Sequence, residues 1–297
     1  MAKQQSMGTR LAIVVLAWAS SVAVQLNLST TAQATTFYVD GGHTYQIVTE
    51  NRTWADAASD ATSRLVDGTP GHLIVLESDH ENTVLFDSLL AHIPEEDFDL
   101  TVSPDGGRGA YAWIGASDIV TEGQWIWDGD GDGTGTLFWQ GTGNGGGNVV
   151  DGAYENWGHD PRNPSQQWEP DNASGQDAGV IGLRDWPRGF QGQWNDVRPT
   201  NLLYYIVEFD TLPRIGDANI DSVVDEADLE IVTTHLFQSG GWTDGDFNVD
   251  GVVDGRDFNL WLRNRDRSGV RSVPEPNLGL LACVGFLFCS RRLARGN

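Results

Sequence analysis

The sequence predicts an α+β domain, with two helices and loop-rich antiparallel sheets, followed by a small all-α pair of loop–helix units. Three observations carry this prediction. Two segments with helical apolar spacing come early, short apolar strands separated by Gly-rich loops follow them, and an acidic loop pattern occurs twice further along the chain. Glycine is frequent, at 36 of 297 residues, which indicates many turns rather than long helices.

The chain is strongly acidic. Its formal net charge is −24, from 18 Lys and Arg against 42 Asp and Glu. Such a surface repels nucleic acid and attracts divalent cations, so we expect no nucleic-acid partner. The two cysteines, Cys283 and Cys289, both lie in a C-terminal apolar run. The rest of an exported chain would therefore be held by packing, or by bound metal acting as a staple.

The first 34 residues have the pattern of a secretory signal peptide. Lys3 and Arg10 precede an apolar run over 11–24, and a polar stretch with small residues follows it. The apolar run is too short to span a bilayer, which argues against a permanent anchor. We therefore expect export, with a signal peptide over 1–34.

A second targeting pattern lies at 269–297. Pro-Glu-Pro at 274–276 precedes a short apolar run over 278–289, and two arginines follow it. The apolar run is of marginal length for a transmembrane segment. This order resembles the PEP-CTERM sorting signal of bacterial proteins. The resemblance implies processing by an exosortase-type enzyme, transient membrane anchoring at the C-terminus, and display at the bacterial cell surface or release into the extracellular space.

Residues 35–212 read as one domain whose first half is helical. A strand pair, 37–39 and 45–48, is expected around Gly41-Gly42. The first helix is expected after a cap at Asn51 or Thr53, with an apolar face of Trp54, Ala57, Ala58, Ala61 and Leu65. The second is expected from Ser78, with Glu81 completing a capping box and an apolar face of Val84, Leu85 and Leu89.

The second half of this domain predicts short strands between long loops. The expected strand pieces are 112–115, 124–127, 179–182 and 203–207. Asp128, Asp130 and Asp132 form half of a calcium-loop pattern, but Trp139 stands at its twelfth position instead of an acid. Metal binding and plain solvation both stay open for this triplet.

Two polar stretches, 168–172 and 194–196, carry the functional prediction. Each places carboxylate and amide oxygens beside a tryptophan, in polar Gly-rich sequence that we expect to form loops. Calcium is bound by six to eight such oxygens, and sugar hydroxyls can join that shell. The pair therefore indicates a calcium site that binds a small polar ligand such as a glycan. The alternative is that both are merely solvated acidic loops.

Several motifs of this domain resemble those of the C-type lectin-like family. They are Trp113-Ile114-Gly115, the segment 122–127, Glu169-Pro170-Asp171 and Trp194-Asn195-Asp196, in the family's order. The resemblance implies a calcium site made by Glu169, Asp171, Asn195 and Asp196, with Asp177 or else Gln176 as a further ligand. It implies that Trp194 belongs to the core. Trp168 and Trp186, in polar loops, are the better candidates for stacking on a sugar.

The chain departs from the family in ways that keep a second hypothesis open. The triad Glu-Pro-Asp is a hybrid of the two family forms, so the sugar cannot be read from it. The usual cystines are absent, and the loops over 128–147 and 184–192 are enlarged. The alternative is a lectin-like module for protein interaction or structural display that binds no sugar.

An acidic loop occurs twice within 213–268, offset by 29 residues from Asp217 to Asp246. The repeated ligand positions are Asp217, Asn219, Asp221, Val223 (by its carbonyl), Asp225 and Asp228, and then Asp246, Asn248, Asp250, Val252 (by its carbonyl), Asp254 and Asp257. This is EF-hand loop spacing, with Gly251 at the turn and Ser222 in its place in the first copy. Apolar residues of a following helix share one face in each copy: Leu229, Val232 and Leu236, then Phe258, Trp261 and Leu262.

The repeated unit resembles a type I dockerin, an all-α calcium module whose partners are cohesins. Glu226-Ala227 and Gly255-Arg256 stand where that family usually has Ser-Thr, which puts a cohesin-like partner in doubt. A calcium-stabilised spacer is the alternative.

No catalytic motif is apparent, and the histidines are scattered. Glu169 and Asp196 could be read as a glycosidase pair, but calcium ligation explains them better. We therefore expect no enzyme. The sequence predicts an exported bacterial surface protein that binds carbohydrate, such as a surface polysaccharide, in a calcium-dependent manner.

Overall fold

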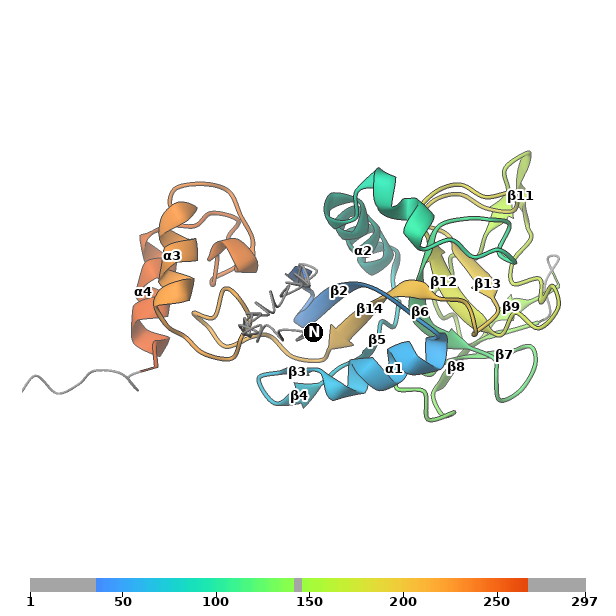
Figure 1. Ribbon diagram of the computed structural model, residues 1–297, viewed down its shortest axis with the longest axis horizontal. Helices are drawn as coiled ribbons and strands as arrows, with labels where there is room; N and C mark the ends of the chain where they lie inside the picture. Colours follow the sequence, from blue (N-terminus) through green and yellow to red (C-terminus); the bar gives the residue numbers. More distant parts are fainter. Residues whose placement is uncertain (1–35, 142–145, 267–297) are drawn as a thin grey trace, which may run out of the picture. The chain divides into compact units, whose positions relative to one another are not determined.

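The computed structural model describes residues 36–141 and 146–266 (Figure 1). The predicted signal peptide over 1–34, and the predicted sorting signal over 269–297 with its candidate transmembrane run, lie outside the described residues. Within 36–141 and 146–266, no helix combines the length and the apolar character needed to cross a bilayer.

The larger part of the described chain mixes helices and strands. Its helices are α1 (Trp54–Ser63), α2 (Asp79–His92) and the 3-10 helix η1 (Glu95–Leu100). Its strands are β1 (Thr36–Asp40), β2 (His43–Arg52), β3 (Leu65–Val66), β4 (Thr69–Pro70), β5 (His72–Leu73), β6 (Tyr111–Ser117), β7 (Gln124–Trp127), β8 (Thr136–Gln140), β9 (Asn148–Val149), β10 (His159–Asp160), β11 (Asn163–Gln167), β12 (Ala178–Gly182), β13 (Trp194–Val197) and β14 (Leu203–Phe209). The predicted strand pieces all lie within these strands.

Most of the strands belong to one sheet, in the order β1-β2-β14-β6-β7-β8-β9. Strand β12 pairs with both β6 and β13, and β5 pairs with β14. The neighbours β14 and β6 are parallel, and the other pairs in the sheet are antiparallel. Every residue of β6 and β14 is buried, so these two strands form the centre of the domain.

Helices α1 and α2 pack on opposite faces of β14, as Figure 1 shows. Successive side chains of a strand point to opposite faces, and β14 follows this rule. Ile206 packs in one cluster with Leu85 of α2, whereas Tyr205 packs in the other cluster with Ala58 of α1. Strand β14 is therefore covered on both sides, which explains why its residues 203–207 form a continuous apolar run.

The helix starts and the first turn follow from local sequence. Gly41 and Gly42, with φ of 59° and 100°, form the two-residue turn of the β1–β2 hairpin, as predicted. Of the two candidate caps for α1, the structure selects Thr53, whose hydroxyl accepts the Asp56 N–H at 3.2 Å. Leu65 does not extend the apolar face of α1, because the helix ends at Ser63 and Leu65 is 61% exposed.

Helix α2 begins as predicted, but its capping box is modified. The Ser78 hydroxyl accepts the Glu81 N–H at 3.2 Å. The Glu81 carboxylate reaches back to the N–H of Glu77 at 2.8 Å, one residue before the position expected for the box. Leu85 and Leu89 are buried, whereas Val84 is only half-buried.

An aromatic cluster fills the core beside β7, β8 and β13. Trp127 stacks on Phe138, with ring centroids 4.4 Å apart, and Trp157 meets Trp194 edge to face at 5.8 Å. Trp194 is fully buried, which confirms that it is a core residue. The prediction of a loop over 194–196 is wrong, because pairing with β12 and burial of Trp194 hold this stretch as strand β13.

The smaller part, described over 213–266, contains α3 (Glu226–Thr234), η2 (Trp242–Asp244) and α4 (Gly255–Asn264). A helix accompanies each repeat, as the repeat predicts, but it begins at position 10 of the loop, so Asp228 and Asp257 lie in the first turns of α3 and α4. The small core includes Val232, Trp242 and Trp261. Leu236 and Leu262 do not join it as predicted, since α3 ends at Thr234 and Leu262 is 46% exposed.

Candidate functional site

The structure brings the two predicted ligand stretches together at one cavity. Carboxylate oxygens of Glu169, Asp171 and Asp196 all lie within 4.8 Å of one another. Glu169 and Asp171 belong to the loop between β11 and β12, and Asp196 lies on β13, where it pairs with Gly179 of β12. Asn195 lines the same cavity, whose volume is about 180 Å³. Four predicted ligands thus converge from segments about 25 residues apart.

Hydrogen bonds orient these groups toward the cavity. Both oxygens of Asp196 accept backbone N–H groups of the facing loop, Asp171 at 3.0 Å and Asn172 at 2.7 Å. The amide nitrogen of Asn195 donates to the Tyr111 hydroxyl at 3.0 Å, which leaves the amide oxygen as the end available to a ligand. Glu169 accepts the Trp186 indole N–H with Oε1 at 3.4 Å. Its buried Oε2 has no hydrogen-bond partner among the described residues.

The electrostatics of the Glu169–Asp196 pair are unfavourable without a cation. Burial raises the pKa of Glu169, and the neighbouring charge of Asp196 raises it further. Burial also raises the pKa of Asp196, although the N–H of Asn172 opposes this. Two buried carboxyls this close cannot both ionise cheaply unless a positive charge lies between them.

Arg188 supplies one positive charge at the rim, and the sequence did not indicate it. Its guanidinium pairs with Asp171 and lies over the ring of Trp168, 4.9 Å from the ring centroid. It lowers the pKa of Glu169, but less than burial and Asp196 raise it. Its place in the enlarged loop before β13 is the one sequence signal, and that signal does not identify its partner. Trp168 is half-buried, and the Arg188 guanidinium covers one face of its ring.

Asp177 does not join this cluster, and its neighbour Gln176 lines the cavity instead. The Gln176 side chain accepts the Ala173 N–H at 2.7 Å and donates to the Asp105 carbonyl at 3.0 Å. Asp177 lies beside buried Asp118, whose N–H donates to the Asp177 carbonyl at 3.1 Å. Burial raises the pKa of Asp118 to about 7, and the charges of Glu122 and Asp177 add to that shift.

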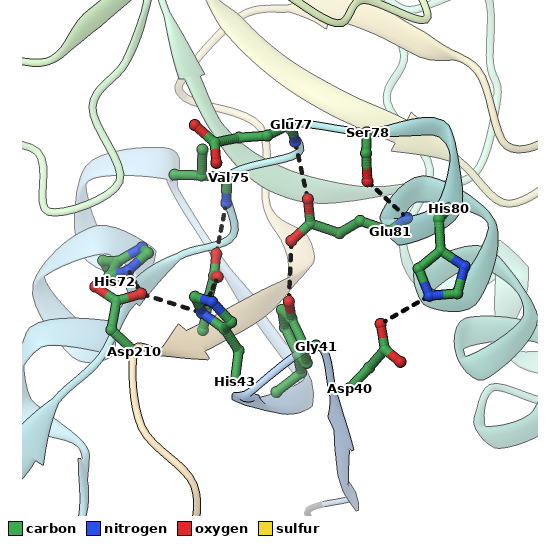
Figure 2. Close-up of a pocket in the computed structure, with 12 residues that line it drawn as sticks. Asp40, Gly41, His43, His72, Val75, Glu77, Ser78, His80, Glu81 and Asp210 are labelled. Carbon is green, nitrogen blue, oxygen red and sulfur yellow. Dashed lines mark hydrogen bonds and ion pairs between the residues drawn. The ribbon is translucent and has the colours of Figure 1, made fainter.

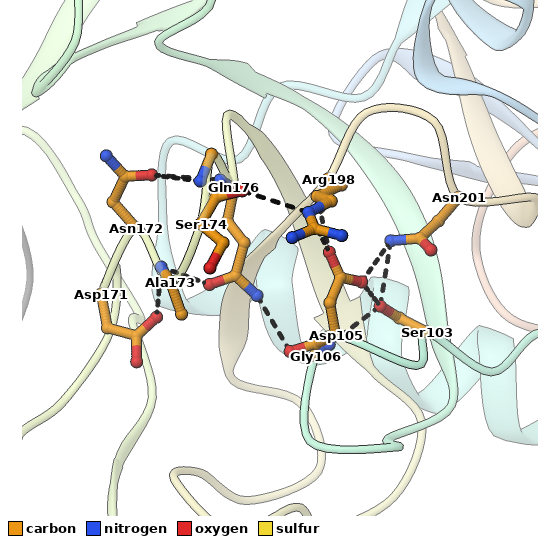
Figure 3. A network of polar contacts seen from close by, with 11 residues as sticks. Ser103, Asp105, Gly106, Asp171, Asn172, Ala173, Ser174, Gln176, Arg198 and Asn201 are labelled. Atoms are coloured by element: carbon orange, nitrogen blue, oxygen red, sulfur yellow. Dashed lines mark hydrogen bonds and ion pairs between the residues drawn. The ribbon is translucent and has the colours of Figure 1, made fainter.

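A polar network holds the wall of the cavity in place (Figure 3). Asp105 accepts hydrogen bonds from Ser103 at 2.7 Å and Asn201 at 2.6 Å. Burial raises the pKa of Asp105, but these bonds outweigh it and leave the pKa below its ordinary value. Gly106 has no room for a side chain, because an added Cβ would lie 2.6 Å from Val197 and 3.0 Å from the amide of Asn195. The wall and the ligand strand are therefore packed directly together.

Of two further predicted features of this domain, Trp186 has a different environment from the one expected. Trp186 is 5% exposed and donates to Glu169, so it is not available for stacking on a sugar. Asp128, Asp130 and Asp132 do gather within 4.8 Å. The twelfth position of that loop, Trp139, is buried in the core and closes no ligand shell.

The two repeats near the C-terminus have the same internal bonding. The buried carboxylate at position 12 accepts the N–H groups of positions 2, 3 and 9: Asp228 from Ala218, Asn219 and Asp225, and Asp257 from Phe247, Asn248 and Asp254. The carboxylate at position 1 accepts the N–H groups of positions 5 and 6: Asp217 from Asp221 and Ser222, and Asp246 from Asp250 and Gly251. Burial raises the pKa of Asp217 to about 6 and also raises the pKa of Asp228.

Comparison of the sequence with known proteins gives one short match. No model of a known protein family matches the chain. A stretch of 116 residues is 35% identical to halomucin of Haloquadratum walsbyi. The match spans 39% of this chain but only 1% of halomucin, so the chain corresponds to a very small part of that protein.

Comparison of the structure gives likenesses to C-type lectin domains. CEL-I, a C-type lectin from Cucumaria echinata, is 20% identical with a TM-score of 0.37, over 58% of this chain and 93% of CEL-I. The carbohydrate-recognition domain of the mouse scavenger receptor C-type lectin is 21% identical with a TM-score of 0.36, over 59% of this chain and 94% of that domain. Herring type II antifreeze protein is 18% identical with a TM-score of 0.35, over 58% of this chain and 94% of its own.

Proposed function

We propose that residues 35–212 form a C-type lectin-like domain that binds carbohydrate through a calcium ion. The observation that carries the proposal is that Glu169, Asp171 and Asn195 line one cavity, and that a carboxylate oxygen of Asp196 lies within 4.8 Å of those of Glu169 and Asp171. The motifs behind the resemblance support it, because Trp113-Ile114-Gly115 lies on central strand β6 and the 124–127 motif forms β7.

The donor set at this cavity fits calcium. It combines three carboxylates with one amide oxygen, and Glu169 Oε2 is buried without a hydrogen-bond partner in the described part of the chain. A divalent cation there would keep Glu169 and Asp196 ionised. The bound calcium would offer coordination positions to a pair of sugar hydroxyls.

Calcium-dependent glycan binding by the whole chain is the first expected result. On a glycan array that includes bacterial polysaccharides, the wild type should bind with calcium and lose binding in EGTA. Glu169→Gln, which keeps the shape of the side chain but removes its charge, should weaken calcium at this site roughly 100-fold, and glycan binding with it. Glu95→Gln, an exposed acid on η1, is the matched control. Glycan binding that survives both EGTA and Glu169→Gln would refute the proposal.

Arg188 is expected to compete with calcium, because its guanidinium already pairs with Asp171. Arg188→Ala should therefore tighten calcium binding at this site about 3- to 10-fold, a modest effect since the side chain is 39% exposed and screened. Calorimetry on the whole chain measures it. Arg184→Ala is the control, because Arg184 lies in the same loop but pairs with Asp99 at 3.0 Å. Weaker calcium binding in Arg188→Ala would mean that the arginine builds the site.

The second candidate function is a lectin-like module for protein interaction or structural display, with no sugar bound. Arg188 favours it, because this side chain partly neutralises the cluster and covers Trp168. The same glycan array separates the two: calcium binding without any glycan binding supports display. Neither function requires catalysis, and we propose a binding protein rather than an enzyme.

We further propose that the repeats over 213–266 form a dockerin-like calcium module on an exported bacterial surface protein. Their matching hydrogen bonds support a tandem calcium module. A pull-down with cohesin-like proteins of the same organism tests docking, and absence of any such partner leaves the spacer role. The signal-like patterns at 1–34 and 269–297 support export and exosortase-type processing.

A further inference from the structure

A second cavity, separate from the calcium cavity, is lined by histidines and acids (Figure 2). Its volume is about 520 Å³, and it lies where the β1–β2 hairpin, β5, β14 and the start of α2 meet. The titratable residues that line it are Asp40, His43, Tyr45, His72, Glu77, His80, Glu81, Glu208 and Asp210. It shares no lining residue with the cavity at Glu169.

The sheet brings four of these residues together from distant parts of the sequence. His43 is the first residue of β2, and His72 is the first residue of β5. Both strands pair with β14, where Glu208 lies opposite His72, and Asp210 follows directly after the strand. The arrangement is therefore fixed by strand register rather than by flexible loops.

The donor atoms have the spacing of a small metal site. His43 Nδ1 lies 2.9 Å from Glu208 Oε1 and 3.3 Å from Asp210 Oδ1. His72 Nε2 lies 3.5 Å from the same Asp210 oxygen. A tetrahedral ion with bonds of about 2.0–2.2 Å to nitrogen and oxygen holds its ligand atoms about 3.4 Å apart. The ligand atoms of His43, Glu208 and Asp210 all lie within 4.8 Å of one another, and the two measured distances from His43 Nδ1 are close to this spacing.

The hydrogen bonds around the cluster leave its inner atoms unsatisfied. His43 Nδ1 is buried and finds no hydrogen-bond partner within 36–141 and 146–266, although Glu208 is so close. His72 Nδ1 lies 2.9 Å from the Leu73 carbonyl, which can only accept, so we assign the proton to Nδ1. His72 Nε2 faces a carboxylate oxygen of Asp210 at 3.5 Å. The buried His43 Nδ1, which lies beside two carboxylates without a hydrogen bond, is therefore the atom that calls for a cation.

Glu208 is the buried anchor of the cluster. Its side chain is 4% exposed, and Oε2 accepts the Val75 N–H at 2.9 Å. That bond orients Oε1 toward His43, as the Leu73 carbonyl orients His72. Ligands held by a hydrogen bond to their second atom are typical of metal sites. The further acids Asp40 and Glu77 at the cavity attract cations.

We propose that His43, Glu208 and Asp210 form a site for a divalent transition metal of the zinc class, with His72 at its edge beside Asp210. The imidazole nitrogen favours zinc over calcium, because calcium takes oxygen ligands, whereas zinc accepts nitrogen and oxygen together. The two carboxylates balance the charge of the ion. With three protein ligands a water completes the tetrahedron, and the site joins strand β2 to the end of β14. Such a staple does the work of a disulfide in a domain that has no cysteine over 36–266.

Zinc titration of the whole chain in saturating calcium tests the proposal. Calcium occupies the proposed calcium sites, so the titration measures zinc binding at the remaining site. Co²⁺ then replaces zinc as a spectroscopic probe. The wild type should bind one zinc with micromolar or tighter affinity, and its Co²⁺ form should show the intense visible absorption of tetrahedral coordination. His43→Ala and Asp210→Asn should each weaken zinc at least about 100-fold and abolish that absorption.

Three controls keep the result decisive. His92→Ala removes an exposed histidine of α2 outside the cavity, and His80→Ala removes the histidine that pairs with Asp40 instead; both should leave zinc affinity unchanged. Asp210→Asn guards against misfolding, because that side chain is 65% exposed. Zinc binding that persists in both His43→Ala and Asp210→Asn, or displacement of zinc by millimolar calcium, would overturn the proposal.

Discussion

In calcium-free buffer, the free energy of unfolding is expected to fall as the pH rises from about 5 to 8, and Glu169→Gln should remove the part of that fall that comes from the Glu169–Asp196 pair, leaving the part due to other buried acids such as Asp118 and Asp217. The folded state raises the pKa of both Glu169 and Asp196 above the ordinary carboxyl value near 4. Folded protein therefore holds protons that the unfolded chain releases. The stability from this pair is complete below about pH 4 and is lost as the pH rises through the raised values.

The expected size of this effect is on the order of 2–4 kcal/mol, since each unit of pKa shift corresponds to about 1.4 kcal/mol and the two groups share their protons. Glutamine keeps the shape of Glu169 but carries no charge at any pH. Urea denaturation of the whole chain at several pH values, with EGTA present, measures the slope. A variant more stable than the wild type at pH 8 also shows that lost calcium binding in Glu169→Gln is not a folding defect.

Calcium should reverse the pH slope of the wild type. The ion binds deprotonated ligands, so it replaces protons and binds more tightly as the pH rises. Glu95→Gln, on the exposed surface of η1, should behave like the wild type throughout. A free energy of unfolding that stays constant over this pH range without calcium would contradict the prediction. It would mean that a neighbouring positive charge already compensates Glu169 and Asp196, and Arg188 would be the group to test next.

The elements that could be predicted from sequence are those set by neighbouring residues. Gly41-Gly42 gives the hairpin because both residues take positive φ, which only glycine does without strain. Ser78 and Thr53 start helices because a side-chain oxygen meets an N–H three residues on. Even here the sequence left a choice of cap for α1, since both candidates lie within three residues of the helix start at Trp54.

Contacts between distant segments were harder to predict. The polar composition around 194–196 indicates a loop, yet pairing with β12 and the burial of Trp194 make it a strand. Gln176 and Asp177 immediately precede β12, and the two take different sides: Gln176 lines the cavity and Asp177 lies beside Asp118. In extended chain a shift of one residue changes the face, so a motif alone does not identify the ligand.

Pairs of interacting side chains that come from distant segments could not be predicted from the sequence. Nothing local to Arg188 says that it pairs with Asp171, and His43 and Glu208 meet only because β2 and β14 are neighbours. The repeats over 213–266 were the opposite case. There the ligand spacing itself predicts the loop. Both copies take a positive φ at position 6, 69° at Ser222 and 85° at Gly251, although only the second has a glycine there.

Removing calcium is expected to open the module over 213–266. Its core is small, and the buried carboxylates at positions 1 and 12, namely those of Asp217, Asp228, Asp246 and Asp257, are exposed by only 0–2%. In the first loop, burial raises the pKa of Asp217 and the charges of Asp228 and Asp221 raise it further, so without a cation these carboxylates repel one another. At a calcium concentration 100 times its dissociation constant, each site adds about 2.7 kcal/mol of stability, or about 5 kcal/mol for both.

Hydrogen exchange on the whole chain, with calcium and with EGTA, measures this opening. The N–H groups bonded to Asp228 and Asp257 should exchange at least 100-fold faster in EGTA, and Trp242 and Trp261 fluorescence should shift toward that of exposed indole. Asp246→Asn should produce most of this change in the second loop even with calcium present. Glu230→Gln, an exposed acid on α3, is the matched control and should change nothing.

Unchanged exchange in EGTA would mean that the backbone hydrogen bonds to Asp228 and Asp257 are sufficient without metal, since these bonds form a capping box at the start of each helix. The module would then be a rigid spacer at any calcium concentration. Opening in EGTA would instead make its order depend on external calcium, as at the lectin-like site. Both parts of the chain would then be switched by the same ion, and the affinity of each would decide which responds first.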